Sequence, residues 1–431
     1  MKKVAFYTLG CKVNQYDTQT MIELFKAEND KYQIVSFEEF ADIYIVNTCT
    51  VTAMSDKKSR QILSRAFKQN NDALIVVAGC FAQTDAEKAM AIPGVRLVIG
   101  NKNRKSIVRL VDLAQHSQEP INAVEKITST DDFEDLPAIT EGQTRAYLKI
   151  QEGCNQFCSY CIIPFARGAI RSRSLNSIIT QAKSLAQNGF KEIVITGIHL
   201  ASYKTKQDED LCDVIYALND INGIERIRLG SLEPRVIDEK FVQAIKANKK
   251  VCLQIHLSLQ SGCDEILKKM NRKYTTSDFE NSVTLLRKNF PSVAITTDII
   301  AGFPGETEAD HNDTMLFIKK VKLSKTHVFP YSPRKSTVAA KMPNQIENSI
   351  KHMRAKEIIT LTESLQREFI SSFIGETKNV LFEQFEYGYL YGYTSNYIYT
   401  KVKSNQDLSN KIIPVKITGE QNLTAIGEME E

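Results

Sequence analysis

Short apolar runs alternate with polar stretches along the first part of the chain. Five of these runs are rich in β-forming residues and span residues 4–9, 32–37, 42–47, 74–79 and 96–100. Polar stretches that suit helices lie between several of them, at about 17–29, 54–70 and 84–90. Alternation of this kind predicts an open, mostly parallel sheet that is covered by helices.

The alternation resumes near residue 144. Six apolar runs fall at 147–150, 192–197, 226–231, 254–259, 295–302 and 326–331, with helix-like segments such as 174–188 and 276–289 between them. This succession of βα units predicts a full or partial (β/α) barrel. A long helical pattern follows at 346–373.

The composition changes after Gly375, where β-forming and turn residues dominate and predict a small all-β module. The acidic segment 129–137 lacks apolar periodicity and ends in proline, which is typical of a linker. We therefore predict an α/β multidomain protein. Its segments are an N-terminal open parallel α/β domain at 1–112, a linker at 113–143, a partial (β/α) barrel at 144–371 and a small all-β barrel at 372–431.

The composition is that of an ordinary globular protein, with 42% hydrophobic and 25% charged residues among 431. The first residues lack the apolar core and the cleavage site of a signal peptide. No apolar run approaches the roughly 18 residues of a membrane span, so we expect a cytoplasmic protein without a membrane partner. In that reducing compartment, nine cysteines indicate metal binding, catalysis or simple burial rather than disulfides. The net charge of +4 does not by itself indicate a nucleic-acid partner.

Three cysteines, Cys154, Cys158 and Cys161, form a CxxxCxxC motif directly after the first strand of the predicted barrel. Thiolates are the usual protein ligands of iron–sulfur clusters, and close spacing lets one loop wrap a cluster. Three thiolates hold three irons and leave the fourth open for a substrate, as in catalytic zinc sites. A zinc knuckle and buried thiols are the alternatives, although zinc sites prefer two separated pairs or additional histidines.

The motif and its position resemble the radical SAM superfamily. The resemblance implies that the open iron binds S-adenosylmethionine (SAM) through its amino and carboxylate groups. It also implies that an electron from the cluster breaks a carbon–sulfur bond of SAM to give a 5′-deoxyadenosyl radical. Tyr160, beside the last cysteine, is expected to pack near the adenine.

A second set of cysteines, Cys11, Cys49 and Cys80, is scattered in sequence but regular in position. Each follows the carboxyl end of a predicted strand, and in an open parallel sheet those ends converge on one edge. The three thiols could therefore meet in space and form a site. Coincidental, partly buried cysteines remain the alternative at this point.

Together the six cysteines resemble the methylthiotransferases, a radical SAM family that adds methylthio groups to unactivated carbons, and the resemblance covers essentially the whole chain. It implies two [4Fe–4S] clusters: an auxiliary cluster on Cys11, Cys49 and Cys80, and a SAM-binding cluster on Cys154, Cys158 and Cys161. It also implies two SAM molecules, one for methylation of the sulfur and one for the radical. The C-terminal module matches the position of the TRAM domain, a small OB-like barrel that binds RNA.

Further segments that resemble the family are 196–200, 230–234, 258–275 and 296–307. Several lie at the carboxyl ends of barrel strands, where such enzymes build their sites. The residues that the resemblance makes candidates for SAM or substrate contacts are Thr196, Gly197, Glu233, Ser258, Gln260, Arg272 and Asp298. Each of them could instead be a satisfied structural polar group.

The branch of the family is indicated by TLGCKVNQYDTQ (8–19), CSYCIIPFARGAIRSR (158–173) and His199. These segments resemble the threonylcarbamoyladenosine branch, although Phe165 replaces the tyrosine that relatives carry. The implied reaction is 2-methylthiolation of N6-threonylcarbamoyladenosine at position 37 of tRNA, with an electron donor such as flavodoxin and a sulfur donor that the sequence does not identify. The alternatives are isopentenyladenosine in tRNA, a ribosomal-protein aspartate, and an iron–sulfur or zinc RNA-binding protein without radical activity.

Two further groups of residues are candidates for contact with RNA. Arg167, Arg171 and Arg173 suit phosphate or carboxylate recognition, so one of them could read the threonylcarbamoyl group; a solvated charged face is the alternative. The C-terminal tyrosines at 387–399 could stack on unpaired bases or could belong to a core.

Overall fold

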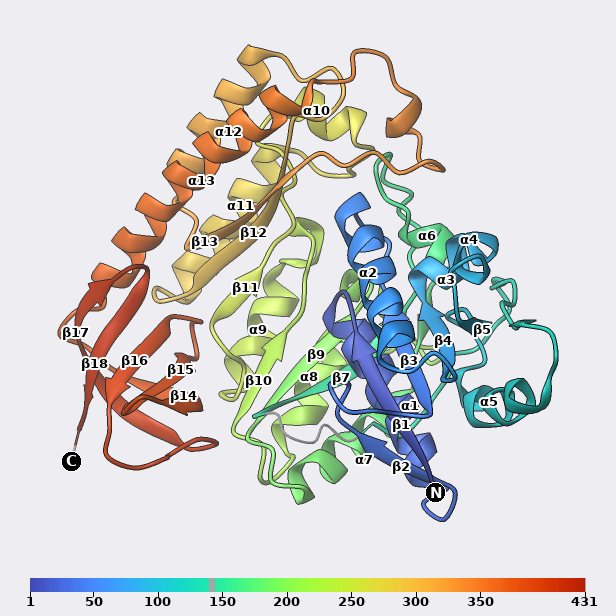
Figure 1. The fold of residues 1–431 in the computed structure, drawn as a ribbon. Coiled ribbons are helices and arrows are strands. Elements are labelled where there is room, and N and C mark those ends of the chain that lie inside the picture. Colours follow the sequence, from blue (N-terminus) through green and yellow to red (C-terminus); the bar gives the residue numbers. More distant parts are fainter. Residues whose placement is uncertain (139–143, 431) are drawn as a thin grey trace.

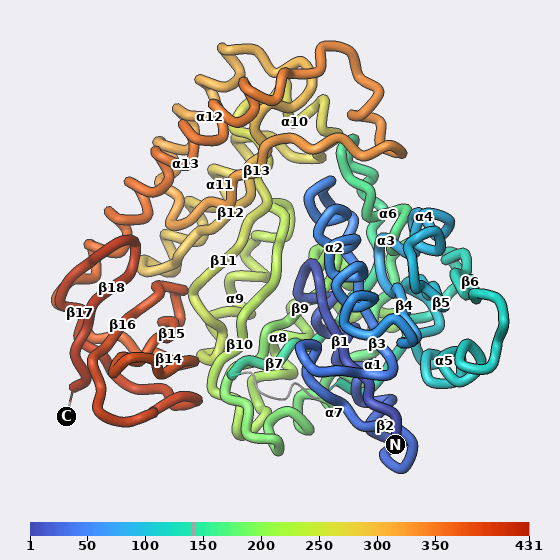
Figure 2. Tube along the Cα trace, in the orientation of Figure 1, coloured from blue at the N-terminus to red at the C-terminus, as the bar shows by residue number. Residues whose placement is uncertain are grey.

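The computed structural model describes residues 1–138 and 144–430. The last part of the predicted linker, 139–143, lies outside the described residues. Figure 1 shows three bodies: an N-terminal sheet with its helices, a central domain of strands and helices, and a small C-terminal barrel. The N-terminal sheet and the C-terminal barrel lie on opposite sides of the central domain (Figure 2).

The N-terminal sheet is wholly parallel, with the strand order β2-β1-β3-β4-β5-β6. Its strands are β1 (Lys2–Thr8), β2 (Tyr32–Val35), β3 (Ile43–Thr48), β4 (Leu74–Gly79), β5 (Val95–Ile99) and β6 (Ile121–Asn122). Its helices are α1 (Lys12–Lys26), α2 (Ala53–Gln69), α3 (Cys80–Thr84), α4 (Ala86–Met90), η1 (Arg104–Ser106) and α5 (Ile107–His116). The predicted open parallel sheet is confirmed. It extends beyond the predicted boundary at residue 112, which falls within α5, because β6 pairs with β5.

Alternation along the strands explains why helices cover both faces of this sheet. Tyr44 and Val46 of β3 pack in one buried cluster with Leu63 of α2. Ile43 and Ile45 point the other way, into a cluster with α1 and α5. Burial on both faces makes these strands continuous apolar runs, as parallel sheets require.

The central domain is a partial barrel built from two sheets, β10-β9-β7-β8 and β11-β12-β13. Isolated parallel bridges between Ile227 and Val251 and between Leu232 and Leu257 join the two. The strands are β7 (Arg145–Glu152), β8 (Arg171–Ser172), β9 (Glu192–Gly197), β10 (Arg226–Leu229), β11 (Gln254–His256), β12 (Ala294–Ala301) and β13 (Lys325–Pro330). Only β8 is antiparallel to its neighbour, β7.

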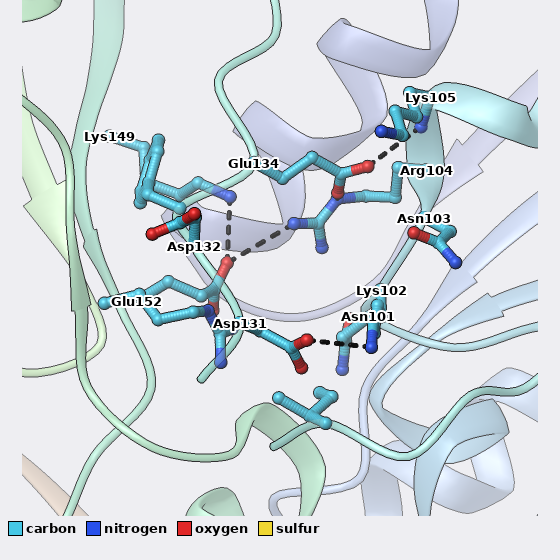
Figure 3. A pocket seen from close by; sticks show the side chains of 13 residues that line it. Asn101, Lys102, Asn103, Arg104, Lys105, Asp131, Asp132, Glu134, Lys149 and Glu152 are labelled. Carbon is cyan, nitrogen blue, oxygen red and sulfur yellow. Dashed lines mark hydrogen bonds and ion pairs between the residues drawn. The ribbon is translucent and has the colours of Figure 1, made fainter. Parts of the chain in front are cut away.

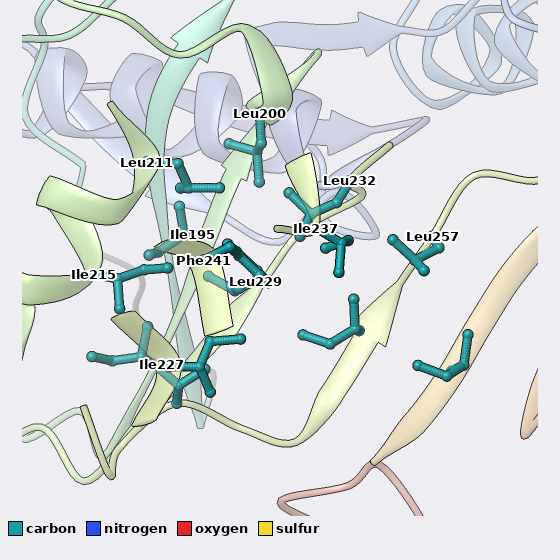
Figure 4. Packing of buried hydrophobic residues seen from close by; sticks show 14 of the residues in the cluster. Ile195, Leu200, Leu211, Ile215, Ile227, Leu229, Leu232, Ile237, Phe241 and Leu257 are labelled. Atoms are coloured by element: carbon teal, nitrogen blue, oxygen red, sulfur yellow. The ribbon is translucent and has the colours of Figure 1, made fainter. Parts of the chain in front are cut away.

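Helices α7 (Leu175–Gln187), α8 (Leu211–Asn219), α9 (Glu239–Ala247), α11 (Thr276–Asn289), α12 (Glu308–Val321) and α13 (Asn348–Ser371) pack on the outside of this barrel. The domain also contains α6 (Ile163–Arg167), which contacts the N-terminal domain, and η2 (Leu200–Ser202), η3 (Pro234–Val236), α10 (Asp264–Lys269) and η4 (Ala339–Lys341). Figure 4 shows the core beneath the outer helices, where Ile195 and Ile227 of the strands meet Ile215 and Phe241 of α8 and α9. Among the described residues, no helix is both long enough and apolar enough to span a membrane.

The C-terminal module is a closed barrel with the strand order β14-β15-β16-β18-β17. Its strands are β14 (Thr377–Glu386), β15 (Tyr389–Thr394), β16 (Tyr399–Lys403), β17 (Ile412–Gln421) and β18 (Thr424–Met429). All neighbours are antiparallel except β16 and β18. Val380, Leu390 and Val415 are fully buried in its core. The predicted small all-β barrel is confirmed, and α13 leads directly into it.

Candidate active site

The first group of cysteines lies at one edge of the N-terminal sheet. Cys11 follows β1, Cys49 follows β3 and Cys80 follows β4, and these three strands are neighbours. The loop that carries Cys11 needs glycine at position 10, where φ is 111° and an added Cβ would lie 2.9 Å from the Cβ of Cys49. The convergence expected from the strand ends therefore occurs in the structure.

Asn14, on the first turn of α1, ties the loops around these cysteines together. Its Nδ2 donates hydrogen bonds to the carbonyl oxygens of Leu9, at 2.7 Å, and Thr48, at 3.0 Å. Its Oδ1 lies 3.8 Å from the Sγ of Cys11 and 4.0 Å from the Sγ of Cys80. One buried amide thus fixes two of the three cysteine-bearing loops.

Two nitrogen donors point at the sulfur of Cys80. Arg167 Nε lies 3.3 Å from Cys80 Sγ, and Asn101 Nδ2 lies 3.6 Å from it. Asn101 also donates to the carbonyl oxygen of Ala166 at 2.8 Å. N–H donors to cysteine sulfur stabilise thiolate charge and tune the potential of iron–sulfur clusters.

Burial acts on two thiols of this group. It raises the pKa of Cys49 to about 11, and it raises the pKa of Cys11 as well. Cys49 is buried, whereas the Cys11 residue retains exposure to solvent.

The second group lies on the loop after β7. Gly153 begins this loop with φ 76°, and a Cβ at this position would meet the carbonyl oxygen of Ala169 at 1.9 Å. The backbone N–H of Gln156 points at the Sγ of Cys154, at 3.5 Å. Burial raises the pKa of Cys154 to about 11 and that of Cys161 to about 12. The loop therefore holds its thiols within a tight backbone turn.

Arg272 connects this loop to the rest of the barrel. Its Nη1 lies 3.1 Å from Cys158 Sγ, and its Nη2 donates to Glu233 Oε1 at 2.8 Å. Its guanidinium stacks on the ring of Tyr274, 4.7 Å from the centroid. His199 Nε2 lies 3.3 Å from the same Glu233 oxygen. The structure thus brings three predicted residues, Arg272, Glu233 and His199, into one group beside a cysteine.

The donor set suits two iron–sulfur clusters. Each group supplies three thiols, and each has an arginine N–H within 3.3 Å of one sulfur. Among the described residues, no three His, Cys, Asp or Glu side chains are close enough together to hold a single metal ion.

The remaining predicted SAM contacts lie on separate strands of the central domain and on the loop after β7. Thr196 and Gly197 end β9, and Asp298 lies on β12, where Oδ2 is 3.4 Å from His256 Nε2. Tyr160 packs edge-on against Phe303, with ring centroids 6.5 Å apart.

Ser258 and Gln260 contribute through the backbone. The carbonyl oxygen of Ser258 accepts a hydrogen bond from the Tyr274 hydroxyl. Gln260, with φ 70°, exchanges backbone hydrogen bonds with Asp298 and Ile300 at 2.9 Å each. These bonds show structural roles for both residues.

The three candidate arginines are all buried and engaged within the protein. Arg167 is completely buried, and its Nη1 donates to Asp17 at 2.7 Å and to Glu152 at 3.0 Å. Arg171 donates to the carbonyl oxygens of Arg167 and Ala169. The structure therefore gives Arg167 and Arg171 internal contacts in place of the RNA contacts that the sequence suggested.

Arg173 has internal partners as well. It pairs with Asp135, and its Nε donates to Ser177 Oγ at 3.0 Å. Its guanidinium also approaches the hydroxyl of Tyr16, at 3.4 Å. The arginine cluster is therefore not the solvated charged face that the sequence left open.

A buried ion network around Arg167 was not predicted. Lys149 of β7 pairs with Asp17 and with Glu152, the latter at 2.9 Å, and Arg104 also reaches both carboxylates. Figure 3 shows Lys149 and Arg104 pointing toward Glu152, on the wall of a pocket of about 220 Å³. The available signal was the presence of charged residues, Lys149 and Glu152, inside an otherwise apolar strand.

The C-terminal tyrosines separate into two sets. Tyr389 and Tyr391 are partly exposed on β15, and Lys401 Nζ lies 3.9 Å from the Tyr389 ring centroid. Tyr393 and Tyr397 instead face the central barrel, where their rings stack with centroids 4.5 Å apart. Tyr387 belongs to neither set, since it lies in the turn before β15 and is 97% exposed.

Comparisons with known proteins match the whole length of the chain. Residues 3–100 match a family model described as "Uncharacterized protein family UPF0004", and residues 148–318 match the radical SAM superfamily. The chain is 42% identical over 426 residues to the threonylcarbamoyladenosine tRNA methylthiotransferase MtaB of Bacillus subtilis, covering 97% of this chain and 94% of that protein. It is 36% identical over 442 residues to a tRNA-2-methylthio-N(6)-dimethylallyladenosine synthase of Thermoanaerobacter pseudethanolicus, covering 98% and 92%.

Solved structures agree on the fold. The radical S-adenosylmethionine methyltransferase TsrM from Kitasatospora setae, with cobalamin and a [4Fe-4S] cluster bound, matches with a TM-score of 0.57 and 16% sequence identity. The match covers 77% of this chain and 76% of that one. At that identity, the likeness concerns the arrangement of the chain and not its chemistry.

Proposed function

The chain belongs to the radical SAM methylthiotransferase family of tRNA-modifying enzymes, and we propose that it adds a methylthio group to C2 of N6-threonylcarbamoyladenosine at position 37 of tRNA. The relatives named for this substrate, at 42%, 38% and 34% identity, support the choice. Relatives at 36% and 35% identity are named for the dimethylallyl nucleoside, and isopentenyladenosine is therefore the alternative substrate.

The observation that carries the proposal is the connection between the two cysteine groups. Helix α6 begins two residues after Cys161 and ends at Arg167, whose guanidinium contacts Cys80. At a helical rise of ~1.5 Å per residue, the backbone from Cys161 to Arg167 rises roughly 9 Å, and the Arg167 side chain then reaches Cys80. Two clusters joined by one short helix and one arginine side chain can serve one substrate carbon, and this arrangement supports sulfur insertion over simple electron transfer.

We propose that Cys11, Cys49 and Cys80 hold an auxiliary [4Fe–4S] cluster and that Cys154, Cys158 and Cys161 hold a second [4Fe–4S] cluster. When bound, the second cluster supplies the electron that cleaves SAM, and the auxiliary cluster supplies sulfur for transfer. Arg167 and Arg272 provide positive charge next to one thiolate of each group. Tyr160, Thr196, Gly197, Glu233, Ser258, Gln260, Arg272 and Asp298 are proposed to line the SAM site, with two SAM molecules used in each reaction.

The Glu233–Arg272 pair is suited to orient SAM. Glu233 accepts from Arg272 and lies 3.3 Å from His199, so its charge is held by two donors, and this lowers its pKa despite burial. An ionised carboxylate at this position accepts hydrogen bonds from ammonium or ribose hydroxyl groups.

We propose that the C-terminal barrel acts as a TRAM-like RNA-binding domain. Its half-exposed Tyr389 and Tyr391, together with Lys401, combine aromatic faces with a cation, which suits stacking on unpaired bases of the anticodon loop. An electron donor such as flavodoxin, a separate sulfur donor and a cytoplasmic location complete the proposal.

Mass spectrometry of tRNA nucleosides from cells with and without the gene tests the substrate. Loss of 2-methylthio-N6-threonylcarbamoyladenosine in the deletion strain is expected. An unchanged level of this nucleoside, or a loss of the 2-methylthio-isopentenyl nucleoside instead, would overturn the assignment.

Two cysteine substitutions test whether the two proposed clusters have separate roles. Cys158→Ala should abolish both 5′-deoxyadenosine formation from SAM and methylthiolation. Cys80→Ala should abolish methylthiolation while 5′-deoxyadenosine formation persists. Cys212→Ala, at a buried cysteine on α8, is the matched control and should retain both. Loss of SAM cleavage in Cys80→Ala with an intact second cluster would contradict the separate roles proposed for the two clusters.

A further inference from the structure

The ring of Tyr397 is surrounded by cations at the floor of the central barrel, the end at which its strands begin. The ring centroid lies 4.7 Å from the guanidinium carbon of Arg228, 5.9 Å from that of Arg145 and 5.9 Å from Lys325 Nζ. These residues lie near the starts of β10, β7 and β13. The C-terminal module thus inserts an aromatic side chain among cations of the barrel.

Lys12 adds a fourth cation from the N-terminal domain. It is the first residue of α1 and is adjacent in sequence to Cys11. It interacts electrostatically with Tyr397, Arg228 and Arg145, and also with the carboxylate of Glu192. All three domains therefore contribute to one group of side chains, and that group begins one residue from a proposed cluster ligand.

The charges in this group are not balanced. The carboxylates are Glu192, which pairs with Arg228 and Arg226, and Glu383, which pairs with Arg145. Within residues 1–138 and 144–430, neither Lys12 nor Lys325 has an ion pair with a carboxylate. Asp298 lies nearby but pairs with His256. Even with Asp298 counted, cations outnumber carboxylates, and this excess of positive charge can attract an anion.

The group also faces a space that solvent reaches. Lys12 and His327 are exposed. His327 stacks on His256 with ring centroids 6.2 Å apart, and His256 Nε2 lies 3.4 Å from Asp298 Oδ2. His327 and His256 therefore connect the strand that carries Lys325 to Asp298, a predicted SAM contact.

The backbone of Tyr397 is consistent with a fixed functional position. Its φ of 67° is an uncommon, strained conformation for a bulky residue. The turn that holds it is anchored to the barrel, since Asn396 Nδ2 donates to the Ser292 carbonyl oxygen at 3.2 Å and Arg226 donates to the Tyr393 carbonyl oxygen at 2.9 Å.

We propose that Lys12, Lys325 and the hydroxyl of Tyr397 bind the carboxylate of the substituent on N6 of the target adenine. The inference rests on the proposed function and identifies the residues that read its substrate. A carboxylate accepts hydrogen bonds and carries the charge that this group lacks. An isopentenyl group carries no charge and accepts no hydrogen bond from these side chains, so it gains nothing from them. The C-terminal module then recognises the N6 substituent of the adenine in addition to binding RNA.

Binding of anticodon stem-loops to the cluster-loaded enzyme without reductant tests the proposal independently of turnover. Three stem-loops are compared by fluorescence anisotropy: one with threonylcarbamoyladenosine, one with its neutral methyl ester and one with isopentenyladenosine. The parent enzyme should bind the acid on the order of 10-fold more tightly than the ester. Lys12→Met, Lys325→Met and Tyr397→Phe should each reduce that preference, while affinity for the ester stays the same.

The controls are Lys183→Met on the exposed face of α7 and Tyr387→Phe, which should retain the preference. If the variants retain the preference, the proposal is overturned. If acid and ester weaken equally, these residues contact RNA phosphates instead, and the proposal also fails. Lys325 lies on β13, away from the cysteines, so its variant remains informative if Lys12→Met alters iron content. A parent enzyme that prefers the isopentenyl stem-loop would refute the proposed function itself.

Discussion

Two interfaces join the central barrel to its neighbours, and both are rich in buried cations. At the N-terminal interface, Arg104, Lys149 and Arg167 meet Asp17 and Glu152, and all five side chains are at most 5% exposed. Arg104 also pairs with the less buried Glu134, so the three cations meet three carboxylates. Each cation has a carboxylate partner there. At the barrel floor, Arg226 and Arg228 direct several N–H groups to backbone carbonyl oxygens of the C-terminal module.

The difference lies in what each interface leaves unpaired. Carbonyl oxygens satisfy the hydrogen bonds of an arginine without neutralising its charge, so the floor keeps a positive excess that the N-terminal interface does not have. A network whose charges are balanced, which we call closed, fixes two domains relative to each other. A network that keeps a positive excess, which we call open, can do the same and still attract an anion. Composition alone does not distinguish the two, because both contain the same residue types.

Arg167→Met should have the largest effect on stability, because Asp17 and Glu152 lose the completely buried cation that pairs with both of them and keep only Lys149 and Arg104. Removal of one partner from a buried ion pair costs about 3–5 kcal/mol. The chain has no tryptophan, so the urea transition is followed by far-ultraviolet circular dichroism. Arg109→Met, at an exposed position on α5, is the control and should change stability by less than about 0.5 kcal/mol. Equal effects would mean that the network contributes little.

Tyr397→Ala should rank second. It removes stacking on Tyr393 and cation–π contacts with Arg228 and Arg145, together about 2 kcal/mol. Tyr387 is the matched control, since it also has positive φ, 51°, but is 97% exposed. Thermal unfolding of both alanine variants measures the contrast. A similar fall for Tyr387→Ala would assign the effect to the strained backbone instead.

Two lysines, one at each interface, test the difference directly, because their substitutions should change the free energy of unfolding in opposite directions. Lys149→Met should destabilise the protein, since Asp17 and Glu152 lose a partner at the closed interface. Lys12→Met should stabilise it by up to about 1 kcal/mol, because an unneutralised cation leaves the barrel floor. Chemical denaturation of both variants decides the matter, and destabilisation by Lys12→Met would indicate that the floor is balanced by partners.

The smallest expected effect is on the pH dependence of stability. Burial lowers the pKa of His327 and outweighs the attraction of Asp298, while Lys325 and His256 act in the same direction as burial. The unfolded chain therefore binds more protons than the folded protein below the ordinary imidazole pKa of about 6.5, and stability falls as the pH drops through that range. Melting temperatures at about pH 7.5 and pH 5.5 should differ less in His327→Gln than in the parent. An unchanged difference would remove His327 from the explanation.

Local patterns predicted much of the fold. The period-two runs and their spacing gave both parallel sheets, and the change after Gly375 gave the C-terminal barrel. The first helix was expected from about residue 17 but begins at Lys12, because Cys11 takes the N-cap position. The short antiparallel strand β8 was not predicted, since two residues carry no periodicity.

The sequence predicted only those parts of the candidate site that follow from the direction of the strands. Strand ends indicated that Cys11, Cys49 and Cys80 would converge, because parallel strands share an edge. The contact of Arg167 with Cys80 depends on how two domains dock, and sequence spacing does not encode that. The position of Tyr397 depends on the docking of a third domain. Side chains that work across interfaces are therefore the ones that sequence patterns miss.

The meeting of Lys12 with Tyr397 has a consequence for how the enzyme is made. One residue is translated at the start of the chain, and the other only after the whole barrel has been synthesised. The cysteine-bearing loops of a nascent chain can form before the barrel floor exists, because domains generally fold as units during synthesis. A partly translated chain would then carry all six thiols but lack the Tyr397 hydroxyl beside Lys12. Selectivity for the modified base is thus acquired last, as a late step in maturation.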